Sequence, residues 1–267
     1  NKVFKRNLST GHWQSSSSGL PGNSIKDLQV INAQLYVVDQ AGIYRSSDTG
    51  KTWNKVFNAT FSANSLTNHF GKLYVATANG VYYSTDSAQS WSRLDSGSSP
   101  IAIERLFIYQ GNLHGTASGK IYMWDGLWFE VSNKGINCSM VYQLEKNKKH
   151  LFALSTYGLY RYHYNSWDTI TPPTNISWIY PSLAVRGDSL ALSAYGRSNR
   201  NSTIFYSQNN GQSWTQRGAP SRPNALSDVS LRYFGDTLYA TAANSFFYSY
   251  DNGQNWNYRL VHSNRSA

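Results

Sequence analysis

Seven tryptophans recur along this 267-residue chain at nearly even steps. The steps are 40, 38, 37, 39, 47 and 42 residues, between Trp13, Trp53, Trp91, Trp128, Trp167, Trp214 and Trp256. A repeat of about 40 residues has the length of one small four-stranded sheet with its turns. Such a sheet cannot bury both of its faces alone. The chain is therefore expected to stack similar units against one another.

One repeat shows how each unit is built. Residues 25–31, 35–38, 43–46 and 52–56 read as four short strands separated by turns. The apolar second strand returns at Leu35, Leu73, Leu113, Leu151, Leu190 and Leu238, and the third strand carries an aromatic residue at Phe4, Tyr44, Tyr82, Tyr122, Tyr160, Phe205 and Phe247. The predicted fold is an all-β β-propeller of four-stranded blades. A β-sandwich, the alternative, does not repeat an aromatic residue and a tryptophan in fixed register.

The repeat pattern leaves two numbers of blades open. Residues 3–13 align without gaps with residues 43–53, so the chain begins at the third strand of a blade. We expect one propeller domain over residues 1–267, with repeats at approximately 1–17, 25–56, 64–95, 102–132, 139–170, 180–217 and 228–261. Seven blades with the first incomplete are favoured, and six blades are the alternative. An unclosed ring edge would leave unpaired backbone and permit strand exchange with a partner.

A similar turn precedes four of the tryptophans. It reads SSDTGKTW at 46–53, STDSAQSW at 84–91, SQNNGQSW at 207–214 and SYDNGQNW at 249–256. Short Asp or Asn side chains bond N–H groups of a turn, glycine adopts positive φ, and tryptophan offers a large apolar surface. We therefore expect a structural role for Asp48, Gly50, Trp53, Asp86, Trp91, Asn209, Gly211, Trp214, Asp251, Gly253 and Trp256. Ala88 stands where the other turns have glycine, which predicts strain or a different turn shape there.

These turns resemble the Asp-box, or bacterial neuraminidase repeat, with the pattern S-x-D-x-G-x-[ST]-W. The 46–53 copy matches it fully, and the other three copies depart at Ala88, Asn209 and Asn255. Families with such boxes include sialidases, sortilin-like receptors, photosystem II assembly-factor propellers and secreted bacterial propellers. The resemblance covers nearly the whole chain. It implies a protein that is secreted, on the cell surface or periplasmic.

Composition limits the possible partners. The net charge is +10, which favours an anionic partner such as an acidic protein or an acidic glycan. No nucleic-acid-binding module is present, so a nucleic acid is not expected. No apolar stretch approaches 18 residues, so we expect no transmembrane segment.

An enzymatic function has little support in the sequence. The sialidase family usually has an F/Y-R-I-P motif, which is absent here, and the chain has only three glutamates: Glu104, Glu130 and Glu145. Glu104 and Glu145 fall in predicted first strands that face a central channel, so the class stays open. Glycoside hydrolysis generally needs two carboxylates across one site. The histidines lack metal-ligand spacing. We expect no catalytic residue, cofactor or metal, and a sialidase-like glycoside hydrolase is one alternative.

The candidate binding site lies on the loop face opposite the recurrent turns. Loops 171–182, 194–203 and 216–225 are longer than their equivalents or rich in aromatic and basic residues. Together they carry Trp178, Tyr180, Tyr195, Arg197, Arg200, Arg217 and Arg222. Aromatic rings and guanidinium groups suit sugar stacking or an acidic protein patch. The alternative is that the loops only solubilise the protein and Trp178 fills a gap between blades. The predicted function is a non-catalytic binding or scaffold propeller, with a glycan-binding lectin as a further alternative.

Overall fold

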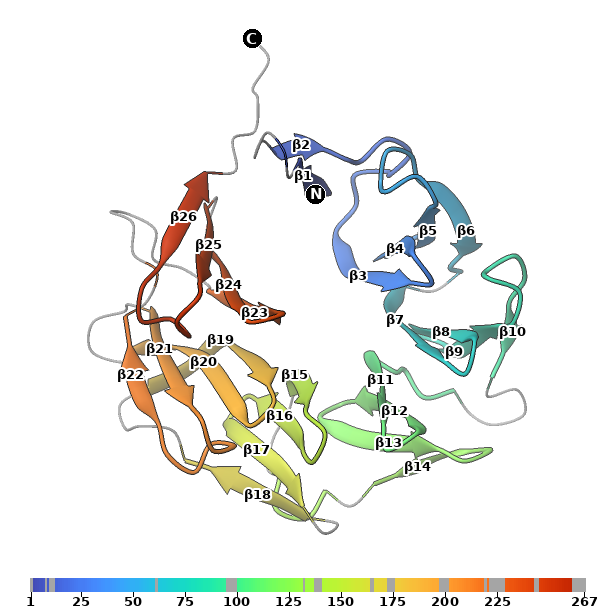
Figure 1. Cartoon of the computed structure of the whole chain (residues 1–267). Helices are drawn as coiled ribbons and strands as arrows, with labels where there is room; N and C mark the ends of the chain where they lie inside the picture. The colour runs from blue at the N-terminus through green and yellow to red at the C-terminus, as the bar shows by residue number, and fades with distance from the viewer. Residues whose placement is uncertain are drawn as a thin grey trace. The chain divides into compact units, whose positions relative to one another are not determined.

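The computed structural model of the chain is built of β-strands. It describes residues 2–7, 9, 13–60, 62–94, 100–131, 133–136, 141–163, 166–171, 176–196, 202–218, 220, 229–242 and 245–260. These residues form six four-stranded antiparallel sheets and one two-stranded sheet (Figure 1). The predicted all-β propeller of four-stranded blades is confirmed. The six complete blades agree with the six-blade alternative and not with the favoured seven, and Phe4–Arg6 and Trp13–Ser15 pair as a separate two-stranded sheet.

The chain divides into two compact units. The first unit, Asn1–Val131, holds the N-terminal hairpin and blades 1 to 3. The hairpin is β1 (Phe4–Arg6) and β2 (Trp13–Ser15); blade 1 is β3 (Ile25–Ile31), β4 (Gln34–Asp39), β5 (Gly42–Ser46) and β6 (Asn54–Asn58). Blade 2 is β7 (Ala63–His69), β8 (Lys72–Thr77), β9 (Gly80–Ser84) and β10 (Ser92–Arg93); blade 3 is β11 (Arg105–Tyr109), β12 (Asn112–Ala117), β13 (Lys120–Trp124) and β14 (Trp128–Glu130).

The second unit, Ser132–Ala267, holds blades 4 to 6. Blade 4 is β15 (Val141–Lys146), β16 (Leu151–Ser155), β17 (Gly158–His163) and β18 (Ser166–Ile170). Blade 5 is β19 (Ile176–Arg186), β20 (Ser189–Gly196), β21 (Ser202–Ser207) and β22 (Thr215–Arg217); blade 6 is β23 (Ser230–Phe234), β24 (Thr237–Ala242), β25 (Ser245–Ser249) and β26 (Asn257–Leu260). In every blade each strand pairs with the next strand along the chain.

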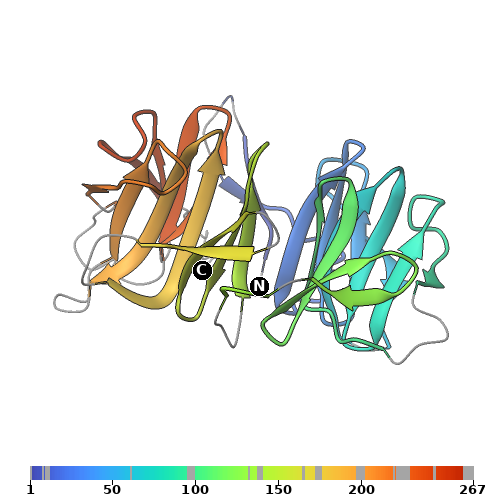
Figure 2. The same ribbon diagram turned by 90° about the horizontal axis from the view of Figure 1, so that it is seen from below.

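The hydrophobic core lies between neighbouring blades of a unit. Val38 and Ile43 of blade 1 are fully buried and cluster with Leu66 and Val75 of blade 2. Blades 2 and 3, 4 and 5, and 5 and 6 share equivalent clusters. Figure 2 shows the blades of each unit edge-on, with their sheets facing one another. Burial of apolar surface between repeats explains why a blade needs its neighbours.

A polar link joins the first strands of neighbouring blades. In four places, a side chain next to a register irregularity in one first strand accepts a backbone N–H of the next first strand. The acceptor and donor residues are Asp27 and Leu66, Ser65 and Leu106, Gln143 and Leu183, and Ser182 and Leu231. An N–H on the inner edge of a sheet has no strand beside it, so these side chains satisfy it. The stacking of blades is thus fixed by hydrogen bonds as well as by apolar packing.

Two glycines adopt positive φ where the chain passes close to a tryptophan backbone. Gly19 and Gly135 adopt φ of 93° and 90° where the chain passes a tryptophan. The N–H groups of Trp53 and Trp167 donate to the carbonyl groups of Ser18 and Lys134 there, at 2.9 and 2.8 Å. A Cβ atom on either glycine would lie well inside van der Waals contact of the tryptophan carbonyl oxygen. Only glycine fits both the backbone angle and the space.

No helix long and apolar enough to cross a membrane occurs among the residues that the structure describes.

Candidate functional site

The structure describes the predicted loop-face residues only in part. Arg197, Arg200 and Arg222 lie outside the described residues, and so do the side chains of Trp178, Tyr180 and Tyr195. The backbone of these three aromatic residues is described, and it belongs to β19 and β20. The expectation that 171–182, 194–203 and 216–225 are loops is therefore wrong for 176–182 and 194–196, which extend the β19–β20 pair, and for 202–203 and 216–217, which lie in β21 and β22.

A bulge explains this difference. Ser177 pairs with Tyr195, and the next pair is Ser182 with Ser193, so five steps along β19 oppose two along β20. Trp178, Tyr180 and Pro181 stand in this irregular segment. Proline has no N–H for a ladder, and sheets accommodate it at bulges. The aromatic residues raise strand propensity around it, which the loop-like sequence TPPTN before them obscured.

Blade 5 is consequently longer than the other blades at one end. Its first strand has 11 residues, and the first strands of the other blades have 5 to 7. Its second strand has 8 residues against 5 or 6 elsewhere. The extra pairs join Ile176 with Gly196 and Tyr195 with Ser202, at the end of β21 opposite Ser207. The recurrent turn follows Ser207, so the extension and the turn lie at opposite ends of the blade.

Arg217 is the one predicted ligand residue whose side chain is described. It lies in β22 opposite Ile204 and is half-buried. Its guanidinium carbon lies 5.5 Å from the centre of the Tyr206 ring, which is a cation–π arrangement. Its Nε–H is buried and has no hydrogen-bond partner among the described residues. Arg217 therefore packs on its own blade.

The four recurrent turns share one hydrogen-bond pattern. In the turn 46–53, the Ser46 hydroxyl donates to Asp48 Oδ1 at 2.7 Å and accepts the Gly50 N–H at 2.8 Å. The Asp48 carboxylate accepts the Thr52 N–H and the Thr52 hydroxyl, at 3.0 and 2.6 Å. Ser84, Asp86, Ala88 and Ser90 repeat these bonds. Ser207 and Ser249 likewise donate to Asn209 and Asp251 and accept the N–H groups of Gly211 and Gly253. The last bond differs: Asn209 Nδ2 donates to the Ser213 hydroxyl, and the Asp251 carboxylate accepts the side-chain amide of Asn255.

Ala88 takes the same backbone conformation as the glycines. Its φ is 71°, compared with 83° at Gly50 and 84° at both Gly211 and Gly253. Of the two expected outcomes, the change of turn shape does not occur, and Ala88 takes a left-handed conformation that is strained for a residue with a side chain. Its side chain is buried in the cluster between blades 1 and 2, which offsets part of this cost.

The aspartates of these turns are held ionised. The Thr52 hydroxyl and then the Thr52 N–H hold the pKa of Asp48 well below its usual range. Ser90 has the same effect on the pKa of Asp86. The N–H and then the side-chain amide of Asn255 lower the pKa of Asp251 to about 2. A general acid must carry a proton near the working pH, so these carboxylates suit a structural role.

The tryptophans of the turns reach back to the preceding sheet. The indole N–H of Trp53 donates to the Ser16 carbonyl at 2.7 Å, that of Trp91 to the Val56 carbonyl at 3.1 Å, and that of Trp256 to the Gly218 carbonyl at 3.0 Å. The buried indole N–H of Trp214 has no such partner among the described residues. These bonds fasten the outer parts of neighbouring sheets together.

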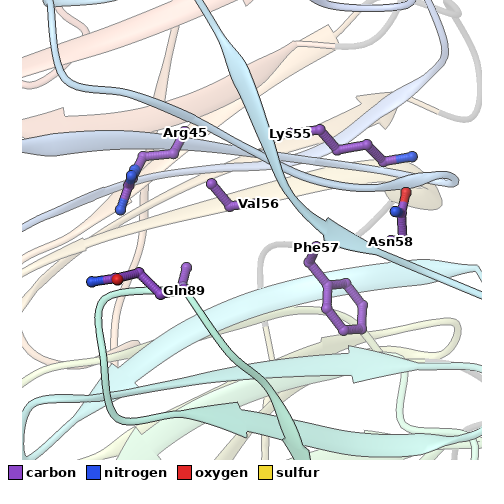
Figure 3. A pocket seen from close by; sticks show the side chains of 7 residues that line it. Arg45, Lys55, Val56, Phe57, Asn58 and Gln89 are labelled. Atoms are coloured by element: carbon purple, nitrogen blue, oxygen red, sulfur yellow. The ribbon is translucent and has the colours of Figure 1, made fainter.

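A basic depression lies between blade 1 and the turn of blade 2 (Figure 3). We call it the Arg45 depression; its volume is about 420 Å³, and it is lined by Arg45, Lys55, Val56, Phe57, Asn58, Ala88 and Gln89. Arg45 Nη1 donates to the Ser87 carbonyl at 2.7 Å, and Lys55 Nζ lies 5.7 Å from the centre of the Tyr44 ring. In the view of Figure 3, Arg45 and Gln89 lie at one end and Lys55 and Asn58 at the other.

An equivalent depression occurs between blades 4 and 5. This Arg161 depression has a volume of about 230 Å³ and is lined by Arg161, Thr169, Ile170, Thr171, Asn210, Gly211 and Gln212. Arg161 and Gln212 occupy the same repeat positions as Arg45 and Gln89. Here, however, Arg161 Nη2 lies 3.5 Å from Asp168 Oδ2, and threonine replaces the lysine. The two depressions thus differ in charge while sharing one architecture.

The lengths of the loops do not indicate these two depressions. Their signal in the sequence is the arginine that follows the third-strand aromatic residue in GIYR at 42–45 and GLYR at 158–161. Only the stacking of blades brings that arginine against the turn of the next repeat, so no single repeat contains the site.

Each of the three glutamates has a partner within its own unit. Glu145 is mostly buried and forms an ion pair with Arg232 of blade 6. Glu104 accepts the Ser118 N–H at 3.1 Å, and Glu130 lies 2.7 Å from Lys120 Nζ. Among the described residues, no three His, Cys, Asp or Glu side chains gather as a metal-binding group.

Comparisons with known proteins agree on the fold. The model of the DUF6242 β-propeller domain matches residues 1–227 of this chain. Comparison with curated proteins gives no match. The structure resembles YCF48 bound to a D1 peptide, with 16% identity, a TM-score of 0.68, and coverage of 90% of this chain and 82% of that one.

Two further solved structures are similar. One is the extracellular domain of the putative hybrid two-component system BT4673 from B. thetaiotaomicron, with 13% identity and a TM-score of 0.71; this chain is covered fully and spans 36% of that one. The other is the GH74 xyloglucanase from Xanthomonas campestris, with 12% identity and a TM-score of 0.76; 98% of this chain is covered and 51% of that one. At such low identity these likenesses concern the fold alone.

Proposed function

The chain belongs to the DUF6242 β-propeller domain family, and from that premise we propose that it is a non-catalytic scaffold that binds a protein or glycan in a secreted or cell-surface assembly. The observation that carries this proposal is the extension of blade 5, whose first two strands exceed those of the other blades. The extension carries three aromatic residues of the candidate site and lies away from the structural turns.

The recurrent turns fit the Asp-box pattern in their chemistry. In each, a buried serine and a carboxylate or amide satisfy the N–H groups of the turn. We propose that all four are Asp-boxes with a purely structural role. In this proposal the residues of the four turns stabilise the blades, and the opposite, extended end of blade 5 binds the partner.

The engagement of the carboxylates supports a non-catalytic role. With the exception of Asp125, each carboxylate among the described residues has a hydrogen-bond or ion-pair partner. A glycosidase needs a pair of carboxylates free to face the substrate. A sialidase-like glycoside hydrolase is nevertheless kept as the alternative, since a GH74 xyloglucanase shares the fold.

Two neighbours support binding and location by analogy of fold. YCF48 is bound to a peptide, and the BT4673 propeller is an extracellular domain. A propeller scaffold can thus present a surface to a peptide or act outside the cytoplasm. For this chain we propose Trp178, Tyr180, Tyr195, Arg197, Arg200, Arg217 and Arg222 as the binding surface.

The test compares binding by the wild-type chain with that of a triple variant, Trp178→Ala with Arg197→Ala and Arg200→Ala. The probes are an array of sialylated, uronate-containing and neutral glycans and an array of acidic peptides. We expect a bound probe whose signal the triple variant loses while Tm stays within about 2 °C, as for surface substitutions. Binding that survives the triple substitution would refute this surface. Turnover of a fluorogenic sialoside or xyloglucan oligosaccharide would refute the non-catalytic role.

A further inference from the structure

We propose that the Arg45 depression is a second, separate binding site that accepts an acidic carbohydrate, namely an oligosaccharide containing uronic acid. It lies between β5 and β6 of blade 1 and the turn 84–91 of blade 2. The extended end of blade 5 belongs to the other unit of the chain. Failure of one site therefore leaves the other testable.

The charge of the depression selects an anion. Arg45 and Lys55 are both among its lining residues, and none of the seven is an acid. Arg45 reaches the turn of blade 2, whereas Lys55 is paired with Tyr44 and its Nζ lies over that ring, so Arg45 is the cation that faces the turn. The nearest acid along the turn, Asp86, faces inward to the hydroxyls of Ser84 and Ser90. A carboxylate entering the depression would meet a guanidinium with donors to spare, because Arg45 uses one N–H for the Ser87 carbonyl. A guanidinium and a carboxylate form paired, parallel hydrogen bonds.

The polar groups that remain suit sugar hydroxyls. Within the described part of the chain, the side-chain amides of Asn58 and Gln89 have no protein hydrogen-bond partner. An amide both donates and accepts, which matches the hydroxyl groups of a sugar. Both amides are exposed and line the same depression as the two cations. Positive charge by itself would accept any anionic ligand. The two side-chain amides favour an anionic ligand that also carries hydroxyl groups.

Phe57 supplies the apolar surface. Phe57 lines the depression and is half-buried, and in the view of Figure 3 its ring lies below Lys55 and Asn58. The rings of Trp91 and Tyr82 hold it, with centres 5.1 and 5.6 Å away. An aromatic ring fixed in this way can support the apolar face of a pyranose. A volume of about 420 Å³ lies within the range of small-ligand sites, which is about 300–1,000 Å³.

The Arg161 depression provides an internal control. It has the same arginine and glutamine, but Asp168 offsets the arginine and Thr169 stands in place of Lys55. We therefore expect it to bind the acidic sugar weakly. Its architecture is otherwise shared, so a difference between the two depressions isolates the contribution of charge.

The experiment measures tetragalacturonate binding to the full chain by calorimetry at physiological salt. The probes for comparison are a neutral galactose tetrasaccharide and a tetraglutamate peptide. The site variant is Arg45→Gln with Lys55→Gln, and the control is Lys149→Gln with Arg161→Gln, which removes the same number of charges. We expect tetragalacturonate to bind, the site variant to lose at least about tenfold in affinity and the control less than about twofold.

Three outcomes would overturn the proposal. Absence of tetragalacturonate binding would remove the site. An equal loss in the site variant and the control would show that the Arg45 depression has no preference over the rest of the basic surface. Tetraglutamate binding as tightly, with the same loss in the site variant, would identify an acidic-peptide site instead. An unchanged melting temperature in both variants shows that each is folded, and Arg45→Lys provides a milder variant if the double substitution unfolds.

Discussion

Replacement of Ser46 by alanine tests whether the recurrent turns depend on a buried hydroxyl. Ser46 is 1% exposed, and its hydroxyl accepts the Gly50 N–H at 2.8 Å. In the Ser46→Ala variant that N–H has no acceptor, and it lies in a buried residue closed off from water. Leaving a buried donor unpaired costs about 1–3 kcal/mol. For a chain of this size, 2 kcal/mol corresponds to a fall in Tm of roughly 4–8 °C.

Thr52→Ala is the matched control in the same turn. Thr52 is exposed, and its hydroxyl donates to Asp48 Oδ2 at 2.6 Å. Water can replace that exposed hydroxyl in the variant, so the loss of stability is expected to be smaller than in Ser46→Ala. The assay is thermal denaturation followed by circular dichroism and by tryptophan fluorescence. If Ser46→Ala lowers Tm no more than Thr52→Ala does, the hydroxyl is not the essential acceptor and the reasoning is refuted.

Three other perturbations follow from the same structure. Gly135→Ala forces a side chain onto a backbone with φ of 90° and against a carbonyl oxygen, so a loss well above about 1 kcal/mol is expected; an unchanged urea midpoint would contradict it. Trp53→Phe removes a hydrogen bond and Trp214→Phe removes an unpaired buried N–H, so the first should destabilise more, by about 1–3 kcal/mol in urea unfolding; equal losses would count against this assignment. The pKa of Asp251 is about 2 in the folded chain and about 3.9 when unfolded, so its contribution to stability is present above pH 4 and is lost as pH falls toward 2. Asp251→Asn, which copies Asn209, should reduce the fall of Tm over that interval, and an unaltered pH profile would rule out this contribution.

The repeat pattern predicted the blades well because it is local. Tyr44 and Phe247 lie in third strands as expected, and Val38 lies in a buried second strand. Each depends on side-chain period and on turns of a few residues, which a single repeat contains. The bulge around Pro181 was missed because the proline-rich segment before it is typical of loops.

The paired depressions could not be found in the same way. Arg45 meets Ser87 of the next blade, and Arg161 lies with Asn210 of the next blade in one depression. These residues are 42 and 49 positions apart, so no short motif joins them. These residues come together only because one blade stacks on the next, and the residues of a single repeat do not indicate that stacking.

The amino-acid sequence by itself determined the kind of unit, its period and the chemistry of its turns, because strand alternation, glycine angles and short polar side chains act over a few residues. The tertiary structure decided how the units are joined: through Trp53 to Ser16, through Asp27 to Leu66, and through the apolar clusters between blades. It also decided that Arg45 stays open while Arg161 is offset by Asp168. The physical reason is distance along the chain: hydrogen bonds and burial between blades depend on positions about 40 residues apart, and only the folded chain brings these together.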